Sequence, residues 1–271
     1  MAEMEGEKLE AEKLFEAVET IMNPSIGQER RGEAYRICEN FKETSPLCAH
    51  CGLLLSSIEN PPVVRHFGLQ LIEHHIKFRW NFLSQEEKCC IKNSAMNLLT
   101  KGTNSILDEE AHIKDGMSRI IVEMIKREWP QQWPELLNEL SELCKVGETQ
   151  KELVCLIFLR LVEDIVTLQN VQNQRRREIY QALTSNLQKI FVFFVTSLKT
   201  HYYEYKTLET QKELVCLIFL RLVEDIVTLQ NVQNQRRREI YQALTSNLQK
   251  IFVFFVTSLK THYYEYKTLV S

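Results

Sequence analysis

Apolar residues recur at helical spacing along almost the whole chain, and short corners containing proline or glycine separate one such stretch from the next. No stretch alternates apolar and polar residues over the length of a strand. The 271 residues include only 8 Gly and 6 Pro, so turns are few and elements long. We expect helices over residues 7–22, 28–43, 47–58, 63–80, 85–100 and 108–127. Long helices joined by short corners predict an all-α fold, an α–α superhelix of the solenoid type.

A sharp corner is predicted between the sixth of these helices and a further helix over residues 134–145. Two pairs, Trp129-Pro130 and Trp133-Pro134, lie four residues apart there. Proline has no N–H and moves the residue before it out of the helical region, so both tryptophans should be non-helical. Their large rings and N–H groups suit a packing plug at the corner. The alternative is a groove in which the two rings grip a ligand.

Local capping signals mark other helix boundaries. Ser84 and Glu87 have the spacing of a capping box, in which each side chain accepts from the other's backbone N–H. Gly102 is suited to close the helix that this box opens. We expect Asp108 to open the next helix, with the two glutamates after it at the positive end of the helix dipole.

The second half of the chain contains a verbatim repeat. Residues 148–208 and 209–269 are identical over 61 positions. Repeats of a functional solenoid diverge because they meet different neighbours, so perfect identity indicates a recent in-frame duplication or an error in assembling the gene. Each copy predicts two helices, over 151–168 and 174–203 in the first copy. The helix over 151–168 is apolar almost all round and should be buried on most sides, whereas the second copy should form an imperfect final layer.

Charge differs between the two halves. Residues 1–147 carry 17 Lys/Arg and 24 Asp/Glu, a net charge of −7, whereas each repeat copy has a net charge of +2. The acidic first half favours a basic partner. The longest strongly apolar run, residues 153–159, is far too short to span a membrane.

The eight cysteines favour reduced thiols in an intracellular compartment, because no secretory signal is visible. Cys48 and Cys51 have a spacing found in metal and redox sites. A second Cys/His pair of matching spacing is missing. We therefore expect small buried side chains here, with metal or redox use as the alternative.

Motifs of enzyme chemistry are missing from the sequence, including the nucleotide loops, the zinc motif H-E-x-x-H and the nucleophile motif G-x-S-x-G. We expect a protein that is not an enzyme and that uses no cofactor and no metal. His74 and His75 are adjacent on one helix and point about 100° apart, so they cannot hold a metal jointly. His75 lies on the apolar stripe and is expected to be a core side chain with its hydrogen bonds satisfied.

The strongest basic run is Arg175, Arg176 and Arg177, which could contact phosphates. Three consecutive residues cover about 200° of a helix and cannot all face one groove. A solvated helix face is therefore the alternative.

Four stretches that follow one another in the sequence, residues 65–80, 112–137, 147–167 and 174–181, together resemble the importin-β/exportin superfamily of nuclear transport receptors. The first is similar to the core of the importin-β N-terminal domain. The second is similar to the opening of the exportin-one-like domain, where paired Trp-Pro corners recur. The residues that carry the resemblance, expected to be structural, are Phe67, Arg79, Trp80, Trp129, Pro130, Trp133 and Pro134.

The resemblance implies that this superhelix is a HEAT-repeat, ARM-like solenoid, built in three segments. Residues 1–105 would form importin-β N-terminal-like repeats and residues 106–208 exportin-one-like repeats. Residues 209–271 are the second copy, which departs from the family because a different helix pair should follow residue 208. Such receptors are several times longer, so the chain is expected to be an N-terminal fragment.

In this superfamily the second helix of each early pair holds the small GTPase Ran in its GTP form. Ran presents basic surface, which agrees with the acidic first half. The implied contact candidates are polar positions beside the apolar stripes, and an ordinary solvated face is the alternative for any one of them: Gln70, Glu73, His74, Lys77, Asp115, Arg119 and Glu123.

Within the superfamily the chain looks like a receptor that exports structured RNA of the pre-microRNA type, and protein cargo, through the nuclear pore. The implied partners are Ran-GTP, RNA cargo bound mainly by later repeats absent from this chain, and nuclear pore proteins, with no membrane. The implied localisation is shuttling between nucleus and cytoplasm. The alternatives are a generic helical-repeat scaffold or a non-functional fragment that does not bind Ran.

Overall fold

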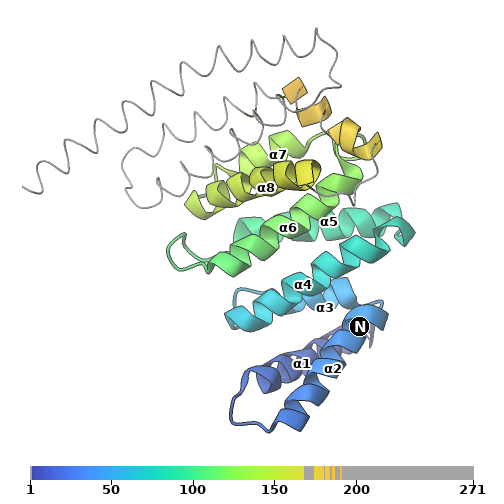
Figure 1. The fold of residues 1–271 in the computed structure, drawn as a ribbon, viewed down its shortest axis with the longest axis vertical. Helices are drawn as coiled ribbons and strands as arrows, with labels where there is room; N and C mark the ends of the chain where they lie inside the picture. The colour runs from blue at the N-terminus through green and yellow to red at the C-terminus, as the bar shows by residue number, and fades with distance from the viewer. Residues whose placement is uncertain (1, 168–173, 180, 184, 187–189, 191–271) are drawn as a thin grey trace, which may run out of the picture. The chain divides into compact units, whose positions relative to one another are not determined.

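The computed structural model describes residues 2–167, 174–179, 181–183, 185–186 and 190 (Figure 1). The chain divides into two units, Met1–Asp164 and Ile165–Ser271, and the account below concerns mainly the first. Most of the helix expected over 174–203, and the whole second copy, lie outside the described residues.

Helices joined by short corners make up the described chain, and no strand occurs in it. This confirms the all-α prediction. The elements are α1 (Ala2–Met22), α2 (Gln28–Thr44), α3 (Cys48–Leu55), α4 (Pro62–Arg79), the 3-10 turn η1 (Trp80–Phe82), α5 (Gln85–Lys101), α6 (Ala111–Glu128), α7 (Leu136–Leu143) and α8 (Glu148–Thr167).

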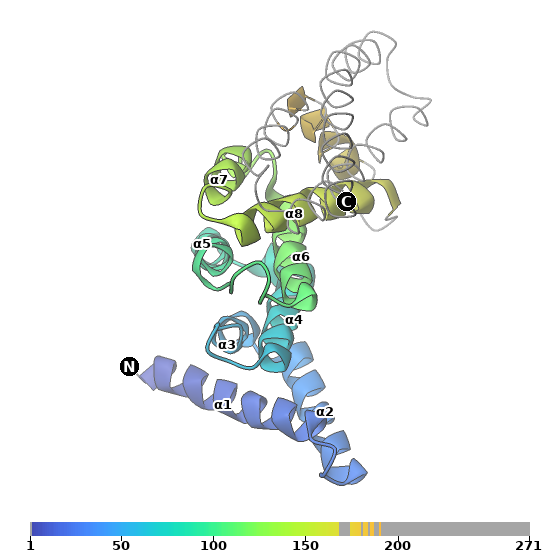
Figure 2. The ribbon, with the colours of Figure 1, turned by 90° about the vertical axis from the view of Figure 1, so that its left-hand side faces the viewer.

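Successive helices of the first unit pair up and stack. The helices α1 and α2 pack together, as do α3 and α4, and α4 also packs along α6 of the next pair. Figure 2 shows α3, α5 and α7 in one layer, and α4 and α6 in the other. We call these the first-helix layer and the second-helix layer. This is the arrangement expected of a HEAT-type solenoid.

The Trp-Pro corner separates α6 from α7. Trp129 has an extended backbone, with φ −84° and ψ 140°, and Trp133 is also outside a helix, as predicted. Both side chains are buried, and Trp133 Nε1 donates to Glu139 Oε2 at 3.1 Å. Buried rings pack the corner and offer no open groove to a ligand. The helix α7 begins at Leu136 rather than at Pro134, because the first two residues after Trp133 form a turn.

The capping box is present. The Glu87 N–H donates to Ser84 Oγ at 3.2 Å and the Ser84 N–H donates to Glu87 Oε2 at 2.7 Å. Gly102 caps the other end of α5, donating its N–H to Leu98 O at 2.8 Å. These three residues act as their local sequence predicts.

The prediction that Asp108 opens a helix is wrong, because α6 begins at Ala111. Arg65 on α4 binds the Glu109 carboxylate through two bonds, Nη1–Oε1 at 2.9 Å and Nη2–Oε2 at 3.0 Å. The Asn104 N–H donates to the same carboxylate at 2.7 Å. These bonds hold Glu109 in the core, and the residues before it form a turn. The Glu109 carboxylate therefore pairs with Arg65 and does not act as a first-turn acid of α6.

The α3–α4 contact depends on glycine. A Cβ added at Gly68 would lie 2.7 Å from Gly52 O and 2.7 Å from the Ser56 backbone nitrogen. Backbone atoms of packed helices cannot move aside as a flexible side chain does.

Gly68→Ala is therefore expected to destabilise the first unit by about 1–3 kcal/mol through overpacking. Gly32→Ala is the matched control, since it lies in α2 with no atom within 4 Å of its Cβ position. This control should stabilise by about 0.5–1 kcal/mol, because alanine favours a helix over glycine. Urea unfolding read by tryptophan fluorescence measures both. An unchanged free energy of unfolding in Gly68→Ala would contradict the packing argument.

Candidate functional site

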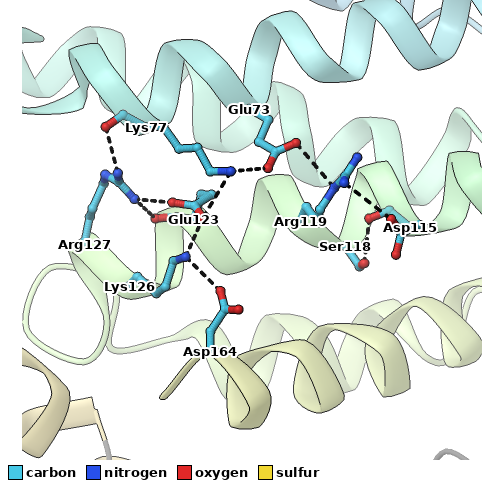
Figure 3. Close-up of polar contacts among 9 residues, drawn as sticks. All are labelled: Glu73, Lys77, Asp115, Ser118, Arg119, Glu123, Lys126, Arg127 and Asp164. Atoms are coloured by element: carbon cyan, nitrogen blue, oxygen red, sulfur yellow. Dashed lines mark hydrogen bonds and ion pairs between the residues drawn. The ribbon is translucent and has the colours of Figure 1, made fainter. Parts of the chain in front are cut away.

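Five of the seven predicted contact residues meet in one ion-pair network on the second-helix layer (Figure 3). From α4, Lys77 Nζ lies 2.6 Å from Glu73 Oε1. Glu73 Oε2 reaches across to α6, 3.3 Å from Arg119 Nε. Arg119 Nη1 lies 3.6 Å from Asp115 Oδ2. Lys77 also approaches Glu123 on α6, at 4.0 Å. We call these five residues, together with Lys126, Arg127, Arg160 and Asp164, the inner network.

Four further residues of the inner network were missed from the sequence. Lys126 and Arg127 both bind Glu123, Arg127 through Nη1–Oε2 at 2.7 Å. Lys126 and Arg127 lie three and four residues after Glu123 on one helix, and this spacing could have predicted both ion pairs from the sequence. Asp164, 2.8 Å from Lys126 Nζ, and Arg160, which pairs with Asp115, come from α8. No local pattern could have indicated these two, because only the fold brings α8 beside α6.

The inner network joins the second-helix layer through charge. Arg127 Nη2 also donates to the Lys77 carbonyl at 2.9 Å, which ties α6 to α4 a second time. Glu73 and Glu123 are buried residues, and their side chains keep only 12% and 9% exposure. A solvated face is therefore the wrong description of these two residues. Lys77 and Arg119 keep 41% and 33% exposure and present charge outward.

Glu123 has a perturbed titration with a clear cause. Burial would raise the pKa of its carboxyl, but hydrogen bonds and positive charge from Lys126 and Arg127 outweigh burial and lower that pKa. The carboxylate therefore stays ionised and holds both cations in place.

Gln70 and His74 lie on α4 outside the inner network. Gln70 Nε2 is 3.0 Å from His66 Nε2, and His74 Nε2 is 3.9 Å from Glu43 Oε2. The His74 ring also packs against Phe78, with centroids 4.6 Å apart. Burial lowers the pKa of His74, so its ring is neutral at pH 7.

His75 is buried as predicted, but its hydrogen bonds are not satisfied. Its Nδ1 finds no hydrogen-bond partner among the residues that the structure describes. The expectation of a fully satisfied core histidine is therefore wrong. Burial, reinforced by nearby Arg79, lowers the pKa of His75 to about 4.

Arg79, at the end of α4, contacts the end of α2, and Trp80, in η1, contacts the end of α6. Arg79 donates to two carbonyls at the end of α2. Glu43 O, at 2.7 Å, lies in the last turn of the helix, and Ser45 O lies directly after it. Trp80 Nε1 donates to Glu128 Oε1 at 2.7 Å, at the end of α6. Phe67 packs, partly buried, against the core of the first helices. These contacts are structural in kind.

The arginine run belongs to the second unit. Residues 174–179 are helical, and Arg175 Nη1 donates to Glu178 Oε2 at 3.1 Å. Arg177 is exposed, whereas Arg175 and Arg176 are half-buried. Phosphate contact by these three residues stays a prediction.

Cys48 and Cys51 are fully buried, as expected of small core side chains. Cys48 Sγ donates to Leu71 O at 3.3 Å. Burial raises the pKa of Cys48 to about 12 and that of Cys51 to about 11, so both thiols are protonated. In the part of the chain that the structure describes, no group of three or more His, Cys, Asp or Glu side chains could hold a metal. Within the same residues, no helix combines the length and apolar character needed to cross a membrane.

Comparison with known proteins adds the family. Residues 34–101 match the model of the importin-beta N-terminal domain, and residues 110–210 match that of the exportin 1-like protein. The gap between them contains the loop from Gly102 to Glu109 that Arg65 holds.

Relatives in three organisms carry the same name. The chain is 52% identical to exportin-5 of Homo sapiens over 199 residues, 73% of this chain and 16% of the relative. It is 51% identical to exportin-5 of Mus musculus over 208 residues, 77% of this chain and 17% of the relative. Exportin-5 of Dictyostelium discoideum is 29% identical over 199 residues, 72% of this chain and 17% of the relative. The chain thus spans about one sixth of the length of these curated relatives. With both domain models in the expected order, the chain belongs to the importin-β/exportin superfamily of nuclear transport receptors and corresponds to an exportin-5-like N-terminal segment.

Proposed function

We propose that this chain is the Ran-binding N-terminal segment of a nuclear export receptor. The observation that carries the proposal is the inner network, together with the family match. Superfamily members hold Ran-GTP on the second helices of their early repeats, and five contact candidates from α4 and α6 converge on that layer. The net charge of −7 over residues 1–147 suits a partner with a basic surface.

The members of the inner network have two proposed roles, positioning and direct contact. Glu73 and Glu123 are committed to internal ion pairs and act as positioning residues. Lys77, Asp115 and Arg119 are partly exposed and are the candidates for direct contact. Side chains held in place before binding lose less entropy on association, which strengthens an interface without adding contacts.

A pull-down with Ran loaded with GTP or GDP tests the proposal on the full chain. We expect retention of the GTP form and none of the GDP form. Equal retention of both forms, or of neither, would remove Ran binding from this segment. In that event, recovery of another partner would favour a generic helical-repeat scaffold.

Arg119→Ala is expected to weaken Ran-GTP binding by about tenfold or more, since Arg119 is partly exposed and pairs with both Glu73 and Asp115 in the inner network. Lys145→Ala is the matched control, because Lys145 is exposed on the corner after α7 and pairs with the nearby, exposed Glu142 outside the inner network. Titration calorimetry reports both affinities, and circular dichroism checks that each variant folds. Equal affinities for the two variants would place the interface elsewhere.

The exportin-5-like sequence supports a proposal for the cargo. We propose structured RNA of the pre-microRNA type, with protein cargo in addition, bound mainly by repeats beyond this chain, and passage through the nuclear pore by contact with pore proteins. The protein would shuttle between nucleus and cytoplasm. The segments 1–105 and 106–208 are proposed as its two domains, followed by the second copy over 209–271.

The arginine run is the place in this chain for a minor RNA contact. If Arg175, Arg176 and Arg177 bind phosphates, affinity for duplex RNA should fall steeply as salt rises. Replacing all three by alanine should reduce that dependence. Affinity unaffected by either change would count against phosphate binding there.

A further inference from the structure

The outward charge of the inner network is positive. Five Lys or Arg side chains and four Asp or Glu side chains make up the network, a net charge of +1. Its three most exposed members are cations, Lys77 at 41%, Arg119 at 33% and Arg160 at 32%. Glu73 and Glu123 are instead buried. The net charge of −7 over residues 1–147 therefore does not describe this part of the surface.

Asp115 on α6 links the two exposed arginines. Its Oδ2 lies 3.6 Å from Arg119 Nη1, and its Oδ1 pairs with Arg160 Nη2 from α8. Among the described residues, Asp115 is the one carboxylate that pairs with Arg160, and the Arg160 Nε has no hydrogen-bond partner. Each guanidinium carries five N–H donors. The two arginines together thus have more donors than the carboxylate between them can satisfy.

A carboxylate of a protein partner suits this excess of donors. The planar fork of a guanidinium binds a carboxylate through two parallel hydrogen bonds. Asp115 already orients both arginines, so less side-chain entropy is lost when a partner binds. A nucleic acid would instead require several phosphates to be neutralised at once, and a net charge of +1 is small for that. The charges therefore favour an acidic group on a protein over RNA.

We propose that Arg119 and Arg160 bind an acidic side chain of the GTPase, and that Asp115 is a positioning residue which holds both arginines. The inference rests on the proposed function and deepens it in two respects. It extends the interface to α8 through Arg160, and it assigns an acidic group to the part of the GTPase that faces the inner network. The basic surface of the GTPase would face acidic residues outside the network.

Two substitutions distinguish an acidic contact from a basic one. Arg160→Gln removes one cation and should weaken Ran-GTP binding several-fold. Asp115→Asn keeps the size of the side chain and an acceptor oxygen for the arginines. It removes the negative charge that repels the partner's carboxylate, so it should tighten binding several-fold. A merely structural role of Asp115 would not produce tighter binding.

Titration calorimetry on the full chain measures these affinities, and circular dichroism checks that each variant folds. Lys145→Gln is the matched control, because it removes one exposed positive charge outside the inner network. Its affinity should equal that of the wild type.

The opposite pattern of affinities would overturn the acidic contact and leave Ran binding in place. That pattern is unchanged or weaker binding in Asp115→Asn, or unchanged or tighter binding in Arg160→Gln. If Arg160→Gln lowers affinity for duplex RNA and leaves Ran-GTP binding unchanged, the arginines bind phosphate instead. A wild-type chain that does not retain Ran-GTP would remove the proposed function, and this inference with it.

Discussion

Arg65→Met is expected to destabilise the first unit by about 3–5 kcal/mol, because it leaves a buried carboxylate without its partner. The Arg65 and Glu109 side chains are only 2% and 1% exposed. Arg65 also donates to Gly102 O at 2.9 Å, so the substitution frees the end of α5 as well. The loop between α5 and α6 should lose its attachment to α4.

Urea unfolding followed by tryptophan fluorescence measures this loss. All three tryptophans, Trp80, Trp129 and Trp133, lie in Met1–Asp164, so the signal reports the first unit alone. Lys13→Met is the matched control, since it breaks the exposed Lys13–Glu10 pair. An exposed pair contributes about 0–1 kcal/mol.

A double variant separates buried charge from lost packing. Arg65→Met with Glu109→Leu removes both charges and should recover much of the stability lost in Arg65→Met. If the double variant is less stable than the single one, the unpaired carboxylate is not the cause. A single variant no less stable than the Lys13→Met control would contradict the prediction outright.

Acid should destabilise the first unit through His75. Burial, with the charge of Arg79 second, lowers the pKa of His75 to about 4 in the folded protein. In the unfolded chain the pKa is about 6.5. Above that value the ring is neutral in both states and contributes nothing to the pH dependence. As pH falls toward 4 only the unfolded state takes up the proton, so stability is lost, by about 3 kcal/mol in full.

The pH dependence of wild type and His75→Phe isolates this residue. Between pH 7.5 and pH 5 the wild type should lose about 2 kcal/mol more than the variant, from the same linkage. The free energy of unfolding of both proteins is measured at pH 7.5 and at pH 5. The difference between the proteins at pH 7.5 gives the packing cost of phenylalanine. The additional difference at pH 5 gives the effect of His75 titration. Equal losses would mean that folded His75 is protonated near its ordinary pKa.

Local features of the fold could be predicted from sequence. The apolar spacing located eight helices to within a few residues, since each buries one face. The capping box of Ser84 and Glu87 and the corner at Trp129 were predictable because backbone hydrogen bonding and proline geometry act within four residues. The helix α8, buried at most of its described positions, was predictable from its nearly continuous apolar surface.

Charged groups were predicted less well, because their positions depend on partners far away in the sequence. Glu109 had the local character of a helix-opening acid, but Arg65, forty-four residues earlier, took its carboxylate. Glu73 and Glu123 looked like surface positions, but the packing of α4 on α6 buried them.

The sequence by itself therefore determined the helices, their order and the family, because helix formation and apolar patterning are short-range properties. Only the tertiary structure decided which charges pair, that His75 Nδ1 is buried without a hydrogen-bond partner among the described residues, and that α8 supplies Arg160 and Asp164 to the inner network. Those outcomes depend on burial and on distances of a few ångströms between elements, and no local pattern encodes either.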